Sequence, residues 1–94
     1  MLEHKEYANG KRVFELIGNQ LTYFFKSGRV KAVGRYEDGQ MEGEWMFYRE
    51  TGQLWQVGHF AGGKKNGTWS RYDRNDRLEY RETFENDKKV KKQG

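Results

Sequence analysis

A repeat of 24 residues is the feature that most constrains how this chain of 94 residues can fold. When the sequence is shifted by 24 residues, its large apolar residues and its turn residues fall into register with one another. The aligned sets are Leu21, Trp45 and Trp69; Phe24, Tyr48 and Tyr72; Val30, Leu54 and Leu78; Tyr36, Phe60 and Phe84; Gly28, Gly52 and Asp76; and Gly39, Gly63 and Asp87. Self-similarity at such a period is typical of stacked repeat architectures. The chain therefore divides into three repeats, 19–42, 43–66 and 67–90, within one domain that spans 1–94.

An incomplete repeat, 7–18, precedes these three. Its segment "YANGK", 7–11, aligns with "YEDGQ", 36–40, and five further residues then intervene before the first full repeat. The intervening segment "VFELI", 13–17, is apolar and predicts either an added edge strand or a short cap on the end of the array.

Each repeat has the composition of a β-hairpin. Segments such as "EWMFYR" and "QLWQVGHF" are rich in aromatic and β-branched residues and lack helical periodicity. "YRETGQL" places a glycine where a four- or five-residue hairpin loop needs a positive φ, and "EDGQ", "AGGK" and "ENDK" suit tight primed turns between hairpins. The fold class that follows is all-β: a meander of antiparallel hairpins in an elongated, twisted sheet.

Alternation along the strands predicts which side chains form the core. The recurring large residues fall on one face, and Gly34 and Gly58 lie between them, where a neighbouring ring has room to lie across the strand. The predicted core comprises Val30, Leu54, Leu78, Tyr36, Phe60 and Phe84, with Leu21, Trp45 and Trp69 packed alongside.

The repeat unit, read as G-x-W-x-x-Y-x-x-x-G-x-L-x-x-x-G-x-F-x-x-G, resembles the MORN repeat, and more closely its bacterial variant in the YwqK-type antitoxin family. The resemblance covers residues 19–90 and is complete from Gly43 to Gly67. The third repeat departs from it, because Asp76, Glu82 and Asp87 replace glycines, which predicts looser turns. The resemblance implies a curved array of hairpins that binds other molecules and, for the variant family, a role as an antitoxin or immunity protein beside a toxin.

The residues offer little catalytic chemistry. The chain has no cysteine, and its two histidines are His4, near the terminus, and His59, whose equivalents in the other repeats are Arg35 and Thr83. No nucleophile with a base, no phosphate-binding loop and no metal-ligand spacing is present, so we expect neither an enzyme nor a cofactor or metal site. A charged amino terminus and the lack of an apolar run of about 20 residues favour a cytoplasmic protein.

A position that changes character between repeats is free for recognition. Lys31, Trp55 and Glu79 are equivalent, and strict alternation places Trp55 on the face opposite the predicted core. Such an exposed aromatic is typical of a binding hot spot; the alternative is that the sheet or the amino-terminal insertion buries it in a second small core. The predicted protein-binding residues are Trp55, Val57, His59, Met46 and Tyr48.

Positive charge is concentrated late in the chain. Residues 64–94 carry ten basic and six acidic side chains, which accounts for the whole net charge of +4. The basic tail, 88–94, contains Lys88, Lys89, Lys91 and Lys92, which would attract an acidic protein or an anionic membrane; a solubilising tail that protects an edge strand is the simpler explanation. Nucleic acid is disfavoured as a partner, because the aromatic residues are committed to the core and acids are interleaved with the bases.

These observations favour a non-enzymatic module that binds and blocks another protein, in the manner of an antitoxin, immunity protein or inhibitor. The alternative is a MORN-like adaptor that binds an anionic membrane surface or a scaffold through the basic carboxy-terminal region. The sequence does not indicate an oligomeric state.

If Trp69 packs as the repeat predicts, Trp69→Ala lowers the free energy of unfolding by about 3–5 kcal/mol, because a large buried ring is lost. Chemical denaturation measures this directly. A midpoint close to that of the unmodified protein would show that the faces are assigned wrongly.

Overall fold

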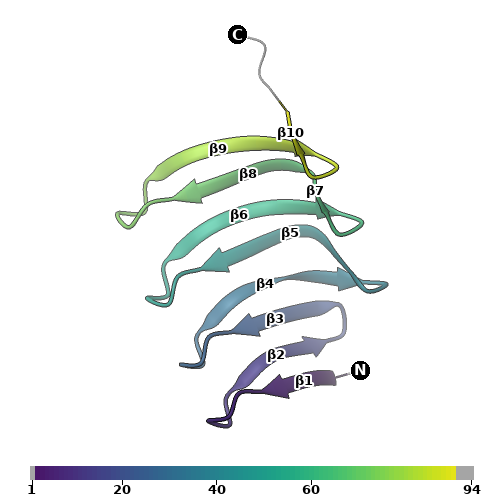
Figure 1. Ribbon diagram of the computed structural model, residues 1–94, viewed down its shortest axis with the longest axis vertical. Helices are drawn as coiled ribbons and strands as arrows, with labels where there is room; N and C mark the ends of the chain where they lie inside the picture. The colour runs from purple at the N-terminus through teal and green to yellow at the C-terminus, as the bar shows by residue number, and fades with distance from the viewer. Residues whose placement is uncertain (1, 91–94) are drawn as a thin grey trace.

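The chain forms one antiparallel sheet (Figure 1). In the computed structural model, which describes residues 2–90, ten strands and no helix are present, and the sheet measures 50 × 34 × 17 Å. The strands are β1 (Leu2–Glu6), β2 (Arg12–Ile17), β3 (Gln20–Phe24), β4 (Val30–Glu37), β5 (Gln40–Tyr48), β6 (Leu54–Ala61), β7 (Lys64–Lys65), β8 (Gly67–Tyr72), β9 (Leu78–Glu85) and β10 (Lys88–Lys89). The predicted all-β meander of hairpins is confirmed.

Neighbours in the sheet follow chain order, so every connection is local. The short β7 pairs with the end of β6, and β8 continues along the same edge of β6 after Asn66. The predicted insertion, 13–17, lies in β2, which pairs with both β1 and β3. It is therefore a strand but neither an edge nor a cap: the amino-terminal edge of the sheet is β1.

One end of the sheet carries four turns of the same design, at 7–11, 25–29, 49–53 and 73–77. In each five-residue turn, the backbone N–H of the first residue donates to the carbonyl of the fifth, and the N–H of the fourth residue donates to the carbonyl of the first. The fourth residue has a positive φ. The alignment of 7–11 with 36–40 is therefore wrong: 7–11 is the equivalent of 25–29. Both kinds of turn need a residue in the left-handed region, so their Gly-containing sequences look alike.

The opposite end carries two-residue turns. Both central residues have positive φ in Asp38–Gly39, Gly62–Gly63 and Asn86–Asp87, which confirms the predicted primed geometry. The prediction of looser turns in the third repeat is not supported, since Asp76 and Asp87 adopt φ values of 62° and 70° like the glycines they replace. Asp and Asn tolerate this conformation better than other residues with a Cβ.

The core is one row of side chains that crosses the sheet. Leu21, Gly34, Trp45 and Gly58 are directly opposite one another on β3 to β6, and Trp45 is 0% exposed. The ring of Trp45 lies on Gly34 so closely that a Cβ there would be 2.3 Å from it, and Trp69 lies on Gly58 with a corresponding distance of 2.1 Å. The predicted core positions Leu21, Trp45 and Trp69, and the predicted use of both glycines, are confirmed.

Each tryptophan is also fixed by a hydrogen bond. The indole N–H of Trp45 donates to the carbonyl of Arg35 at 2.9 Å, and that of Trp69 donates to the carbonyl of His59 at 3.0 Å. These bonds satisfy the polar end of a ring whose body is buried. Arg35 and His59 are equivalent in the repeat, so each bond is made in the same way.

Further aromatic rings extend the core on either side of this row. Centroid distances of 5.0–6.3 Å link neighbouring rings from Phe14 to Phe84, with Phe60 edge-on to both Trp45 and Trp69. Tyr36 packs against the same cluster. The predicted core positions Tyr36, Phe60 and Phe84 are thus confirmed.

The other predicted core residues, Val30, Leu54 and Leu78, do not lie on this face. The register skips Lys31, Trp55 and Glu79, each of which is the extra residue of a β-bulge. A bulge breaks the alternation of side chains. The residue before each bulge is therefore turned to the opposite face, where Val30 lies beside Val33 and where Leu78 is 47% exposed.

Gly58→Ala tests the contact between Trp69 and the strand beneath it. The added methyl group would collide with the ring, so we expect the free energy of unfolding to fall by about 3 kcal/mol. Glu82→Ala is the matched control, because Glu82 occupies the equivalent position opposite Trp69. Equal effects of the two substitutions, measured by urea denaturation, would contradict the role of the glycine.

Candidate protein-binding surfaces

The face of the sheet opposite the tryptophans carries a continuous apolar row. Val33, Met46 and Val57 are direct neighbours on β4, β5 and β6, with Thr22 and Ser70 extending the row on either side. Residues 2–90 form a single sheet, so no second layer packs on these side chains. We call Val33, Met46 and Val57 the apolar row.

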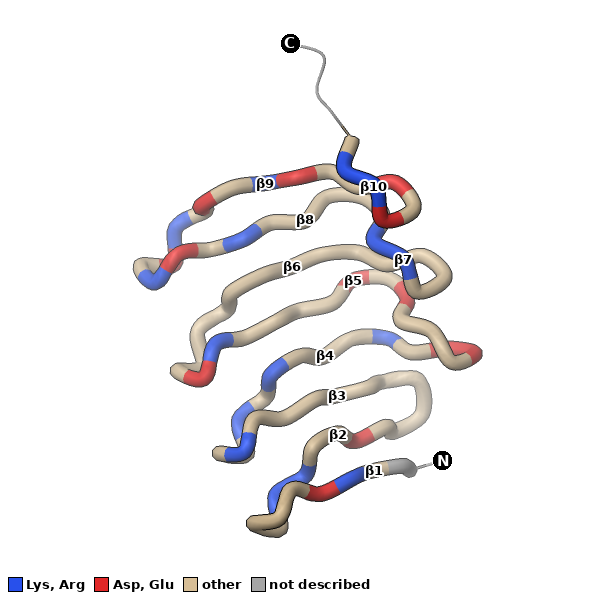
Figure 2. The backbone as a smooth tube through the Cα atoms, viewed as in Figure 1, with Lys and Arg blue, Asp and Glu red and all other residues tan. Residues whose placement is uncertain are grey.

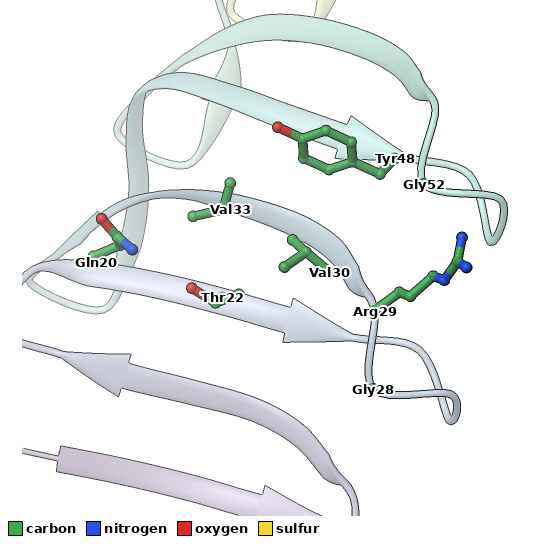
Figure 3. A pocket seen from close by; sticks show the side chains of 8 residues that line it. All are labelled: Gln20, Thr22, Gly28, Arg29, Val30, Val33, Tyr48 and Gly52. Carbon is green, nitrogen blue, oxygen red and sulfur yellow. The ribbon is translucent and has the colours of Figure 1, made fainter.

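A groove of about 620 Å³ adjoins this row (Figure 3). Val30, Val33 and Tyr48 form its apolar lining, and Gln20, Thr22 and Arg29 contribute polar groups. The Tyr48 hydroxyl lies 3.5 Å from the sulfur of Met46, which ties the groove to the row. Arg29 donates hydrogen bonds to the carbonyls of Glu50 and Thr51, so it braces two neighbouring turns.

Four of the five predicted protein-binding residues lie on this face. Met46 and Val57 are paired directly, Tyr48 lies two residues from Met46 on the same strand, and the exposed His59 pairs with Glu44. Trp55 is the exception. Its placement opposite the core rested on strict alternation, which the bulge at Trp55 itself interrupts.

Trp55 lies on the tryptophan face, against Arg71. The guanidinium of Arg71 is 5.1 Å from the centroid of the Trp55 ring and 4.7 Å from that of Tyr80, and it also donates to the side-chain oxygen of Gln56. Arg71 therefore lies between two aromatic rings. Trp55 is half-buried by its neighbours in the sheet, and the amino-terminal insertion is separated from it by β3, β4 and β5.

A pocket of about 330 Å³ lies beside Trp55, between the turns 25–29 and 49–53. We call it the turn pocket; its lining is Phe25, Lys31, Phe47, Tyr48, Arg49, Glu50 and Trp55. Apart from Trp55 and Tyr48, these residues are not among the predicted binding residues. A signal was present, since Lys31 and Trp55 are the equivalent bulge residues of two successive repeats.

The basic tail is partly integrated into the sheet. Lys88 and Lys89 form β10 against β9, and the ammonium of Lys89 lies 2.8 Å from the carboxylate of Glu82. The hydrogen bond to Glu82 raises the pKa of Lys89. Lys89 is therefore already paired, and the remaining predicted residues, Lys91 and Lys92, lie outside the described residues.

A different concentration of positive charge becomes visible only in the fold (Figure 2). Lysines and arginines from every repeat are brought together at the end of the sheet that carries the turns 7–11, 25–29, 49–53 and 73–77. They are Lys11, Arg12, Lys26, Arg29, Lys31, Arg49, Arg71, Arg74 and Arg77; the acidic residues Glu6, Glu50, Asp73, Asp76 and Glu79 lie at the same end and offset part of this charge. The two-residue turn at the opposite end of β4 and β5 is acidic, through Glu37 and Asp38.

The described part of the chain contains no group of three or more His, Asp or Glu side chains arranged to hold a metal ion. Across residues 2–90 there is also no helix with the length and apolar character needed to span a membrane. Comparison with models of protein families, with curated proteins and with solved structures finds no match.

The contact between Arg71 and Trp55 can be measured with a double-mutant cycle that uses Arg71→Ala, Trp55→Ala and the double variant. A partly desolvated cation–π contact is worth about 0.5–1 kcal/mol, so we expect a coupling energy of that size in thermal or chemical denaturation. Strictly additive effects would show that the guanidinium and the ring do not interact in solution.

Proposed function

We propose that this protein is a non-enzymatic module that binds another protein through the uncovered face of its sheet. The observation that carries the proposal is the apolar row, whose side chains are aligned across three strands and have no covering layer. Contiguous apolar surface of this kind is typical of protein interaction sites. The adjoining groove, with Tyr48 at its wall, offers a place for an anchoring side chain of the partner.

The backbone supports the same role. Local hairpins, braced turns and tryptophans locked onto glycines make a preformed surface, so little conformational entropy is lost on binding. Blocking a partner requires such a stable surface and no chemistry of its own. An antitoxin, immunity protein or inhibitor is the class that the repeat resemblance favours.

The test is affinity capture from the native cell, followed by measurement of the purified pair. Val57→Asp places a charge in the apolar row, and we expect it to weaken partner binding by 2 kcal/mol or more, or about 30-fold. Because Val57 lies on an uncovered face, the free energy of unfolding should change by only about 1 kcal/mol.

Thr68→Asp is the matched control, since it adds the same charge at an exposed position outside the apolar row. The proposal is wrong if Val57→Asp and Thr68→Asp bind the partner equally well. Sedimentation with anionic vesicles that does not depend on Val57 would instead favour the membrane adaptor. Rescue of growth on co-expression with the captured partner tests the blocking role.

A further inference from the structure

We propose that the turn pocket is a second binding site, which accepts an apolar side chain flanked by carboxylates from an acidic segment of a partner protein. The pocket lies between two turns of the basic end of the sheet and opens beside Trp55. Its residues differ from those of the apolar row. Tyr48 is shared, since it lines both this pocket and the groove beside the apolar row.

The walls of the turn pocket are aromatic. Phe25, Phe47 and Trp55 come from three separate segments and meet there, and the volume of about 330 Å³ matches the lower end of the range for ligand pockets, about 300–1,000 Å³. Phe47 is held from behind by Trp45 and Trp69, with centroid distances of 6.2 and 5.8 Å. Trp55 is held by Arg71. The walls are thus preorganised to receive one apolar side chain.

Two cationic side chains at the turn pocket, those of Arg49 and Lys31, have N–H donors that no protein group in the described part of the chain accepts from. Arg49 donates through one terminal nitrogen to the carbonyl of Tyr72, while its Nε is buried and has no hydrogen-bond partner. Because that Nε is shielded, an incoming carboxylate oxygen would accept from the terminal nitrogen of Arg49 that is not bonded to Tyr72. Lys31 is exposed, with its ammonium 5.9 Å from the centroid of Phe25. Neither Arg49 nor Lys31 takes part in an ion pair within residues 2–90.

The arrangement favours an acidic protein segment over a phosphate polymer or a lipid surface. Arg29, in the turn 25–29, is already bonded to the carbonyls of Glu50 and Thr51. Glu50, which also lines the pocket, would repel a densely charged ligand. Two available cations beside a small aromatic pocket fit one or two carboxylates that flank an apolar group. The net positive charge of this end of the sheet would attract such a segment over longer distances.

The probe is the synthetic peptide Ac-Gly-Glu-Phe-Glu-Gly-NH₂, which carries two carboxylates, titrated into the ¹⁵N-labelled protein and followed by two-dimensional NMR. The indole N–H groups of Trp45 and Trp69 are bonded to backbone carbonyls, and the signal of Trp55 is identified by its loss in Trp55→Phe. We expect saturable shifts of the Trp55 indole and of the amides at 25–29 and 49–53, with a Kd of about 0.1–1 mM for so short a peptide.

Arg49→Gln and Lys31→Gln should each weaken binding by about tenfold, because each removes one charge-assisted contact. Arg74→Gln, which removes the same charge at the neighbouring exposed turn, is the matched control and should change the Kd by less than about twofold. Lys31 is exposed, so its variant remains informative even if Arg49→Gln impairs folding. Replacing Phe by Ala in the peptide should abolish the shift at Trp55.

Three results would overturn the proposal. The first is the absence of any shift at Trp55 with 5 mM peptide, about five times the weakest Kd expected. The second is equal weakening by Arg74→Gln, which would show that the attraction is general. The third is stronger saturation of the same signals by anionic phospholipid vesicles than by the peptide. None of these results depends on Val57, so failure here leaves the function proposed above to its own test.

Discussion

The whole sheet depends on a tryptophan that lies flat on the backbone of the neighbouring strand. A single layer of strands has no opposing sheet or helix against which to bury its apolar side chains, so it must supply its own cover. Gly58 makes this feasible: without a side chain there, the ring of Trp69 reaches the strand and its N–H reaches the carbonyl of His59. Burial, hydrogen bonding and strand pairing are thereby combined in one contact between successive repeats. The same contact made by Trp45 on Gly34 links the preceding pair.

The bulge that follows each turn at one end of the sheet has a separate consequence. It moves one apolar residue per repeat away from the tryptophan face and places another residue, at Lys31, Trp55 and Glu79, beside that face. Every repeat therefore has one position, the bulge residue, whose amino acid differs between repeats while the backbone stays the same. At Trp55 this position helps to form a pocket, together with residues from the preceding repeat. A surface built in this way can change its chemistry one residue at a time while the core stays constant.

The period, the hairpins, the turns and most of the core could be predicted from sequence, because each depends on residues that recur at fixed spacing. The face of Trp55 could not be predicted. Alternation is a local rule, and a bulge depends on how two strands pair rather than on the bulged strand alone. For the same reason Val30 and Leu54 were assigned to the wrong face. The basic side chains at one end of the sheet were also not predicted. Charge was counted along the chain, whereas the fold brings basic residues of successive repeats side by side.

Glu82 stands where Gly34 and Gly58 stand in the earlier repeats, and its carboxylate is bound to Lys89. A further repeat added after the third would present its aromatic ring to a side chain rather than to bare backbone, and it would have to break an ion pair in order to dock. The carboxy-terminal edge is thus less suited than Gly34 or Gly58 to receive a tryptophan from a neighbouring strand. Position 82 therefore makes a duplication inside the array easier to accommodate than an added repeat that docks on Glu82.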